Sequence, residues 1–234
     1  MSAACATPTA GTGGRAGPAR TVVCFPLKEE AAPFRDRAAR LVSAQVVLTG
    51  IGPANSRRSL EGALAQGAVG LVLTCGFAGG LRPDLAIGTV LFETDVPWLA
   101  AALRAAGAGA ARFHCARRIA VTAAEKQQLR QSTGADAVEM ESACVHELCR
   151  QRGIACATVR AISDTANEDL PLDFNRLSRP DLSLDYGKLA WAIACAPQRI
   201  AGLLRLQAHC KRAAAQLASV IEAILRQHPP LPPA

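Results

Sequence analysis

The sequence predicts a single three-layer α/β domain, in which a mainly parallel mixed sheet is flanked by helices. Short apolar runs alternate with helix-like segments along the chain, which is the order of a doubly wound sheet. The runs are apolar throughout rather than at every second residue, as expected of strands that are buried on both faces. The 234 residues are enough for one such domain with a sizeable core.

Six apolar runs are predicted as strands. They cover residues 22–24, 46–48, 71–74, 90–92, 119–121 and 155–162. A further short run that ends near Val138 is strand-like and leads directly into a helix. Glycine-rich segments at 50–53 and 76–80 follow the second and third strands. They serve either as tight turns or as places where the backbone approaches a ligand closely.

Four helix-like segments fall between the strands, and two more follow the last strand. They cover residues 29–42, 54–66, 123–132, 142–152, 184–195 and 197–225. The last segment has apolar residues at helical spacing, with arginine and lysine residues between them. It predicts either a helix packed on the core with a solvated basic face, or an amphipathic surface that contacts an anionic membrane.

The two ends of the chain differ in composition from the predicted domain, which extends over residues 21–227. Residues 1–20 are rich in alanine, glycine, threonine and proline, and we predict that they form a disordered leader. Residues 228–234 form a proline-rich tail.

The composition argues against several kinds of site. Nine cysteines, an odd number without Cys-x-x-Cys spacing, indicate a reducing cytoplasm rather than a disulfide framework. The four histidines do not cluster with cysteines at ligand spacing, so we predict no metal site. The net charge of +7 suits an anionic surface, but aromatic residues are not interleaved with arginines, so we predict no nucleic-acid partner.

Acidic residues stand at the ends of two apolar runs in the second half of the chain. Glu139 and Glu141 flank Met140 at a strand-to-helix junction. Side chains at such a junction reach the crevice at the end of an open α/β sheet. Asp164 follows Ser163 at the end of another run. Taken alone, Asp164 is better explained as the cap of a following helix.

Together these motifs resemble those of the nucleoside phosphorylase and nucleosidase superfamily. That group includes purine nucleoside phosphorylases and methylthioadenosine/S-adenosylhomocysteine nucleosidases. Five motifs match in family order, each at a strand end, and together they extend over residues 22–164. They are residues 29–30, 50–52, 76–81, 138–141 and 160–164. The resemblance implies a phosphorylase/hydrolase-like fold.

The resemblance also implies a role for each acidic residue. Glu141 would accept hydrogen bonds from the ribose 2′ and 3′ hydroxyls, and Met140 would lie beneath the sugar. Asp164 would donate a proton toward purine N7, which requires a carboxyl pKa raised by burial or by a nearby carboxylate. Glu30 would orient and deprotonate the attacking water. The remaining residues expected to bind substrate are Glu139, Ser163, Gly76, Phe77, Ala78 and Gly52.

Two positions bear on whether water or phosphate attacks the sugar. Phosphorylases of this superfamily have arginines where this sequence has Glu30 and Thr74, and a carboxylate at position 30 would repel phosphate. We therefore expect hydrolysis, while Arg57 and Arg58 keep phosphorolysis open as the alternative. Nucleosidases of the superfamily usually have a serine in place of Phe77, so the water site must differ here.

The segments that enclose the purine and the 5′ substituent in relatives are shortened in this sequence, between residues 95 and 126. This implies an open 5′ side. Residues 123–126, 140–143 and 170–205 resemble the hopanoid-associated phosphorylase branch, in which the implied substrate is adenosylhopane. We therefore expect release of adenine from a 5′-substituted adenosine.

Besides hydrolysis of a 5′-substituted adenosine and phosphorolysis, two other functions remain open. One is a methylthioadenosine/S-adenosylhomocysteine nucleosidase, and the other is a non-catalytic family member that binds a nucleoside or a lipid. The resemblance implies no cofactor and a homo-oligomer. A lipid-tailed substrate and the basic C-terminal helix suggest peripheral contact with a membrane.

Overall fold

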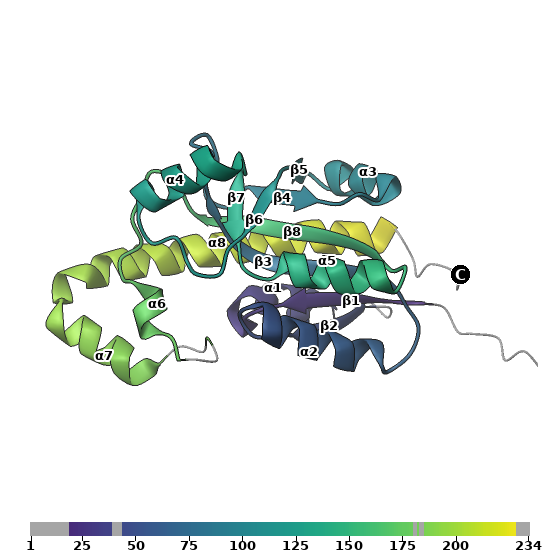
Figure 1. Ribbon diagram of the computed structural model, residues 1–234, viewed down its shortest axis with the longest axis horizontal. Coiled ribbons are helices and arrows are strands. Elements are labelled where there is room, and N and C mark those ends of the chain that lie inside the picture. Colours follow the sequence, from purple (N-terminus) through teal and green to yellow (C-terminus); the bar gives the residue numbers. More distant parts are fainter. Residues whose placement is uncertain (1–18, 39–43, 180–181, 183–184, 228–234) are drawn as a thin grey trace, which may run out of the picture.

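The structure is a computed structural model that describes residues 19–38, 44–179, 182 and 185–227. Residues 1–18 of the predicted leader and the predicted proline-rich tail lie outside this part. An eight-stranded mixed sheet lies between two layers of helices (Figure 1). The predicted fold class, a single α/β domain with a mainly parallel mixed sheet flanked by helices, is confirmed.

Four parallel strands form the middle of the sheet, in the order β2, β1, β3, β8. Their bounds are Arg20–Phe25 for β1, Ala44–Leu48 for β2, Val69–Gly80 for β3 and Ala155–Asp164 for β8. The strand β4 (Val90–Glu93) extends the sheet antiparallel to β8. All five were predicted at nearly these positions from their apolar runs, which are mostly buried in β1, β3, β4 and β8 and only half-buried in β2.

Three short strands complete the sheet. They are β5 (Gly109–Ala110), β6 (Phe113–Cys115) and β7 (Ala137–Glu139). The strand β7 runs antiparallel to the end of β3, where Val138 pairs with Gly79. The sequence indicated β7 through the run that ends at Val138, but it did not indicate β5 or β6.

Helices cover both faces of the sheet (Figure 1). Packing contacts join α1, α3 and α8 on one face, and α2 and α5 on the other. The helices are α1 (Lys28–Ala38), α2 (Pro53–Leu64), α3 (Pro97–Ala105), α4 (Ala123–Thr133), α5 (Ser142–Gln151), α6 (Phe174–Leu177), α7 (Tyr186–Cys195) and α8 (Ile200–Gln227), with a 3-10 turn at Pro197–Arg199. The six predicted helices are present, whereas α3 and the short helix α6 were not predicted.

The predicted strand at residues 119–121 is wrong. In its place, the Asn175 side chain takes the position of a strand partner, because its Oδ1 accepts the Ile119 N–H at 2.9 Å and its Nδ2 donates to the Ile119 carbonyl at 2.9 Å. A side chain from a later segment therefore satisfies the backbone that a neighbouring strand would otherwise satisfy.

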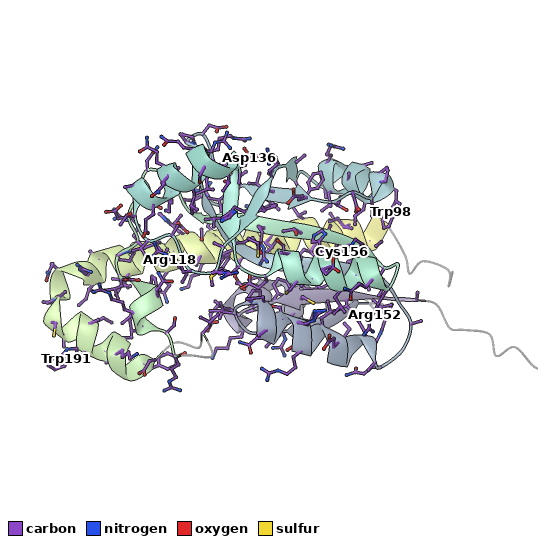
Figure 2. All side chains as sticks on the ribbon, in the orientation of Figure 1. Trp98, Arg118, Asp136, Arg152, Cys156 and Trp191 are labelled. Atoms are coloured by element: carbon purple, nitrogen blue, oxygen red, sulfur yellow. The ribbon has the colours of Figure 1, made fainter. Side chains whose placement is uncertain are left out.

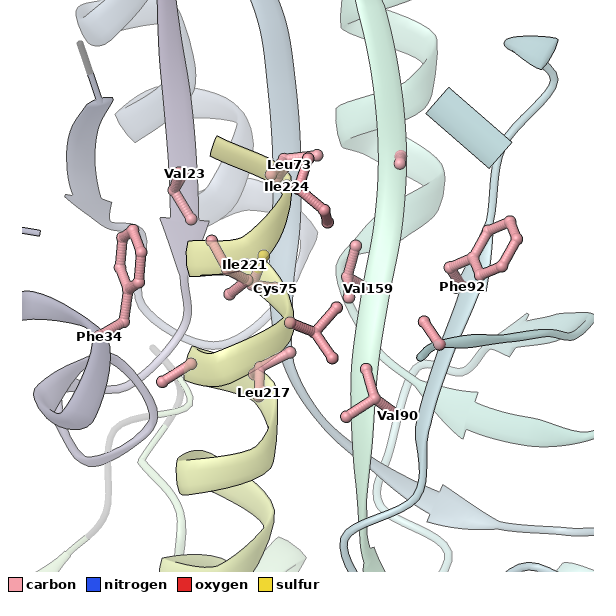
Figure 3. Packing of buried hydrophobic residues seen from close by; sticks show 14 of the residues in the cluster. Val23, Phe34, Leu73, Cys75, Val90, Phe92, Val159, Leu217, Ile221 and Ile224 are labelled. Atoms are coloured by element: carbon pink, nitrogen blue, oxygen red, sulfur yellow. The ribbon is translucent and has the colours of Figure 1, made fainter. Parts of the chain in front are cut away.

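The second half of α8 is part of the core. Leu217, Ile221 and Ile224 are fully buried, and they pack against strand residues such as Leu73 and Val159 (Figure 3). Of the two interpretations of this helix, packing on the core is therefore confirmed for its C-terminal half. The N-terminal half projects beyond the sheet together with α7 (Figure 1).

We predict that Leu217→Ala lowers the free energy of unfolding by about 2–5 kcal/mol, because it opens a cavity between α8 and the sheet. Equilibrium denaturation with urea would measure the loss. Leu204→Ala is the matched control, since Leu204 lies on the same helix but is 60% exposed. Equal losses in both variants would contradict the assignment of this half of α8 to the core.

Candidate active site

The sheet brings the predicted acidic residues to one edge. At the end of β3, Gly79 pairs with Val138 of β7 on one side and with Asp164 of β8 on the other. The side chains that follow these strands therefore converge on a single cavity of about 210 Å³. Eight of the ten predicted site residues line it, namely Glu30, Phe77, Ala78, Glu139, Met140, Glu141, Ser163 and Asp164.

The guanidinium of Arg160 holds the carboxylates of this site together. Its Nη2 donates to Glu139 Oε2 at 2.6 Å, to Glu141 Oε2 at 3.2 Å and to Thr74 Oγ1 at 3.3 Å. The side chain comes from β8 and is fully buried. A buried cation of this kind needs such partners, because desolvation of an isolated charge costs several kcal/mol.

The carboxylate of Glu139 is occupied by protein donors. Besides Arg160, it accepts the backbone N–H groups of Glu141 at 2.9 Å and Ser142 at 2.8 Å, and the Ser142 hydroxyl at 2.6 Å. Burial acts to raise the pKa of Glu139, but the Arg160 charge and the Ser142 hydrogen bonds hold it below its ordinary value. Glu139 is therefore an anion that positions Arg160 and the start of α5.

Glu141 has fewer protein donors and faces the cavity. Its Oε1 accepts the Gly52 N–H at 3.0 Å, which ties the strand-to-helix junction to the start of α2. Gly52 itself does not line the cavity. Burial raises the pKa of Glu141, while the charge of Arg160 opposes that shift. Its oxygens retain lone pairs toward the cavity, as a carboxylate that binds hydroxyl groups needs.

Glu30 reaches the cavity from the first turn of α1. The Leu27 N–H donates to its Oε2 at 2.9 Å, and the Phe77 N–H donates to its Oε1 at 2.8 Å. Burial raises the pKa of Glu30 to about 7, although the Arg160 charge acts in the opposite direction. A carboxylate with this pKa can accept a proton from water near neutral pH.

Gly76 lets Glu30 and Arg160 approach the same point. A Cβ atom at Gly76 would clash with Arg160 Nη1 and would lie 3.1 Å from Glu30 Oε1. The Nη1 and Nε atoms of Arg160 have no hydrogen-bond partner among the described residues. The geometry thus places a guanidinium with unpartnered donors near the Glu30 carboxylate; Glu30 lines the cavity, whereas Arg160 and Gly76 lie behind its wall.

Asp164 is held by a lysine. Its Oδ1 accepts the Ser163 hydroxyl at 2.7 Å, and its Oδ2 lies 2.6 Å from Lys126 Nζ. Lys126 is fully buried in α4 and also donates to the carbonyls of Thr165 at 2.7 Å and Glu168 at 2.9 Å. All three ammonium protons therefore have acceptors.

The capping alternative for Asp164 is wrong, because the next helix is α6 and its N-terminal cap is Asp173. We expected Asp164 to be buried or to have a carboxylate nearby; it is buried, and the charged group beside it is the Lys126 ammonium. Arg160 and Lys126 were both within matching segments, but no local signal showed that either would be buried at the site.

Apolar residues from the C-terminal half of the chain close the cavity. They are Leu170, Phe174, Leu206 and Cys210, so α6 and α8 both contribute to this wall. A second cavity, of about 320 Å³, lies between the segment 168–171 and α8. Leu170 and Leu206 line both cavities, so they adjoin. Among the described residues, no group of three or more His, Cys, Asp or Glu side chains is arranged to hold a metal ion.

Comparison with known proteins agrees with this architecture. A sequence model of the phosphorylase superfamily matches residues 98–193. The predicted resemblance to this superfamily is confirmed. The matched residues include Lys126 and the whole acidic run from Glu139 to Asp164. No curated protein sequence matches the chain.

Several solved structures are similar to this chain. Futalosine hydrolase of Helicobacter pylori superposes with a TM-score of 0.67 at 18% identity, over 90% of this chain and 98% of that one. The 5′-methylthioadenosine/S-adenosyl homocysteine nucleosidase of Helicobacter pylori superposes with a TM-score of 0.66 at 18% identity, over 91% of this chain and 100% of that one. The 5′-methylthioadenosine/S-adenosylhomocysteine nucleosidase of Neisseria meningitidis, in complex with methylthio-immucillin-A, superposes with a TM-score of 0.66 at 17% identity, over 89% of this chain and 99% of that one. At these identities the likeness establishes the fold.

We predict that Arg160→Met lowers the free energy of unfolding by about 3–5 kcal/mol, because it leaves Glu139 buried without its counter-charge. Chemical denaturation at neutral pH would measure the loss. Arg150→Met is the matched control, because Arg150 pairs with Glu147 on the exposed surface of α5. We expect little change there. A similar small effect at Arg160 would show that the cluster does not depend on the guanidinium.

Proposed function

We propose that this protein is a purine nucleosidase, which hydrolyses the N-ribosidic bond of a 5′-substituted adenosine and releases adenine. The observation that carries the proposal is the position of Glu30. A carboxylate with a pKa of about 7 lies beside a free Arg160 donor, in the same cavity as Glu141 and Asp164. A base, a sugar-binding carboxylate and an acid are the groups that such a hydrolysis requires.

The sugar would be held by Glu141 and Met140. The Glu141 carboxylate has lone pairs directed to the cavity, where it can accept hydrogen bonds from vicinal hydroxyls. Met140 lines the same cavity and offers an apolar, polarisable surface. As the bond from C1′ to the purine breaks, positive charge develops on the sugar, and the nearby carboxylates stabilise it.

Water is the nucleophile that the charges favour. Three glutamates (Glu30, Glu139 and Glu141) surround the guanidinium of Arg160 and exert electrostatic effects on it, and the cavity wall itself has one arginine, Arg118. Such a site repels phosphate, which is itself an anion. Glu30 would take the proton of the water while the oxygen attacks C1′, and the buried charge of Arg160 would act on the Glu30 carboxylate from behind the cavity wall.

The purine would leave at the other end of the cavity. The electron pair of the broken bond stays on the purine, and N7 takes a proton from Asp164. The aspartate anion that remains is stabilised by the Ser163 hydroxyl at Oδ1 and by Lys126 at Oδ2. In this proposal Lys126 is a positioning residue that holds Asp164 toward the cavity.

The second cavity bears on the 5′ substituent. It adjoins the catalytic cavity at Leu170 and Leu206, so a group larger than a methylthio group can extend into it. This supports adenosylhopane, or an adenosine with a similar lipid tail, as the substrate. A structural neighbour is named for 5′-methylthioadenosine, which keeps a smaller 5′ group as the alternative. We further propose a cytoplasmic enzyme that forms a homo-oligomer.

Release of adenine from adenosine, 5′-methylthioadenosine and a 5′-alkyl adenosine, each with and without phosphate, tests the function. We expect release that does not require phosphate and is fastest with the alkyl derivative. Strict dependence on phosphate would instead establish phosphorolysis. The variant Asp164→Asn should lose at least about a hundredfold in rate. A nucleoside-binding protein without activity would show affinity for these compounds and no turnover in either form.

The pKa of Glu30 predicts the pH dependence. Because Glu30 must be deprotonated to accept a proton, kcat/KM should rise with pH and level off above about 7. Initial rates between pH 5 and pH 9, spanning about two units on each side of that pKa, would show the limb. Glu30→Gln should abolish the limb together with most of the activity. Glu29→Gln is the control, since Glu29 is exposed, and an unchanged limb in Glu30→Gln would reject the assignment.

A further inference from the structure

The chain carries an exposed extension that the proposed chemistry does not use. We call residues 186–212 the arm: it comprises α7, the 3-10 turn and the first half of α8, and it projects beyond the sheet (Figure 1). No residue of α7 is buried. Four of the six exposed large hydrophobic side chains of the described chain lie on the arm: Tyr186, Trp191, Ile200 and Leu204.

Three of these apolar side chains expose most of their surface to solvent. Trp191 is 72% exposed, Tyr186 is 68% exposed and Leu204 is 60% exposed. Figure 2 shows Trp191 at the outer edge of the arm, away from the sheet. A concentration of exposed apolar side chains on one element marks an interaction surface. Tryptophan and tyrosine in particular combine an apolar ring with a polar group, which suits the boundary between lipid and water.

The charges on the arm have one sign. Between residues 186 and 212 the sequence contains no aspartate or glutamate. It contains five basic residues, all exposed, which are Lys188, Arg199, Arg205, Lys211 and Arg212. A surface that is apolar and uniformly basic complements an anionic lipid headgroup layer, where each basic residue contributes about 1 kcal/mol.

We propose that the arm docks this protein on the surface of an anionic phospholipid bilayer. Insertion of Trp191 and its apolar neighbours would be limited to the interface, since none of the described helices is long and apolar enough to span a membrane. A second copy of the chain suits this face less well. In a two-fold symmetric contact the basic side chains of one arm would meet those of the other, and no acidic residue of the arm would offset them.

Docking at this place also connects to the site. Arg205 and Leu206 of the arm line the second cavity, and Leu206 lines the catalytic cavity as well. A substrate with a lipid tail could therefore pass from the bilayer to the catalytic cavity beside α8. This last step rests on the proposed function, whereas docking itself does not depend on any catalytic activity.

Vesicle flotation of the full chain tests the proposal. We expect recovery with vesicles in which about a third of the lipid is phosphatidylglycerol, little recovery with pure phosphatidylcholine, and loss of binding at high salt. The double variant Lys188→Glu/Trp191→Ser should reduce the partition coefficient at least about tenfold. Neither side chain lines the cavities, so turnover of water-soluble 5′-methylthioadenosine should be unchanged.

The matched control is Leu48→Ser/Arg152→Glu, which removes an exposed apolar side chain and reverses a charge away from the arm (Figure 2 labels Arg152). It should bind vesicles as the wild type does. Equal losses in both double variants, or equal recovery with neutral and anionic vesicles, would overturn the proposal. So would light scattering in which the arm variant alone converts an oligomer to a monomer while no form binds lipid. Failure of nucleosidase activity with intact docking would reject the proposed function alone.

Discussion

The buried guanidinium of Arg160 is the constraint on which the site depends. It is 0% exposed and acts on Glu30 from the start of α1 and on Glu139 and Glu141 from the junction before α5. Its favourable pairing with Glu139 lowers the pKa of that residue, whereas burial dominates at Glu30 and raises its pKa to about 7. One cation thus supports two glutamates with opposite protonation behaviour. The difference follows from geometry, because Nη2 bonds Glu139 directly while Nη1 remains free beside Glu30.

The leaving-group end of the cavity is organised by a second buried cation. Lys126 binds Asp164 and two backbone carbonyls of the segment that follows, so it fixes the carboxylate and the turn after β8 together. Each of the two groups of carboxylates therefore has a buried cation beside it, and neither Arg160 nor Lys126 lines the cavity. Such an arrangement avoids leaving the buried carboxylates without a counter-charge in the interior.

Much of this could be predicted from sequence where the signals are local. Apolar runs indicated the five longest strands, and the acidic residues at strand ends indicated one edge of the sheet. The roles of Arg160 and Lys126 could not be predicted, because each depends on partners brought close only by the fold. Lys126 lies in a polar helix, where a lysine ordinarily faces solvent. The prediction of a strand at 119–121 was wrong for the same reason. Its apolar residues resemble a strand, but the backbone N–H and carbonyl of Ile119 bond the side chain of Asn175, 56 residues later in the chain.

The helix α8 links the core, the cavity and the arm mechanically. Its 28 residues form one continuous helix, which at about 1.5 Å per residue is roughly 42 Å long. The C-terminal half is fixed in the core by Leu217, Ile221 and Ile224. Because the helix is continuous, the orientation of the core half also sets the orientation of the N-terminal half. Leu206 and Cys210 belong to the N-terminal half and line the catalytic cavity. Because the same helix carries exposed residues of the arm and lines the cavity, the proposed docking would place the cavity wall close to the bilayer surface.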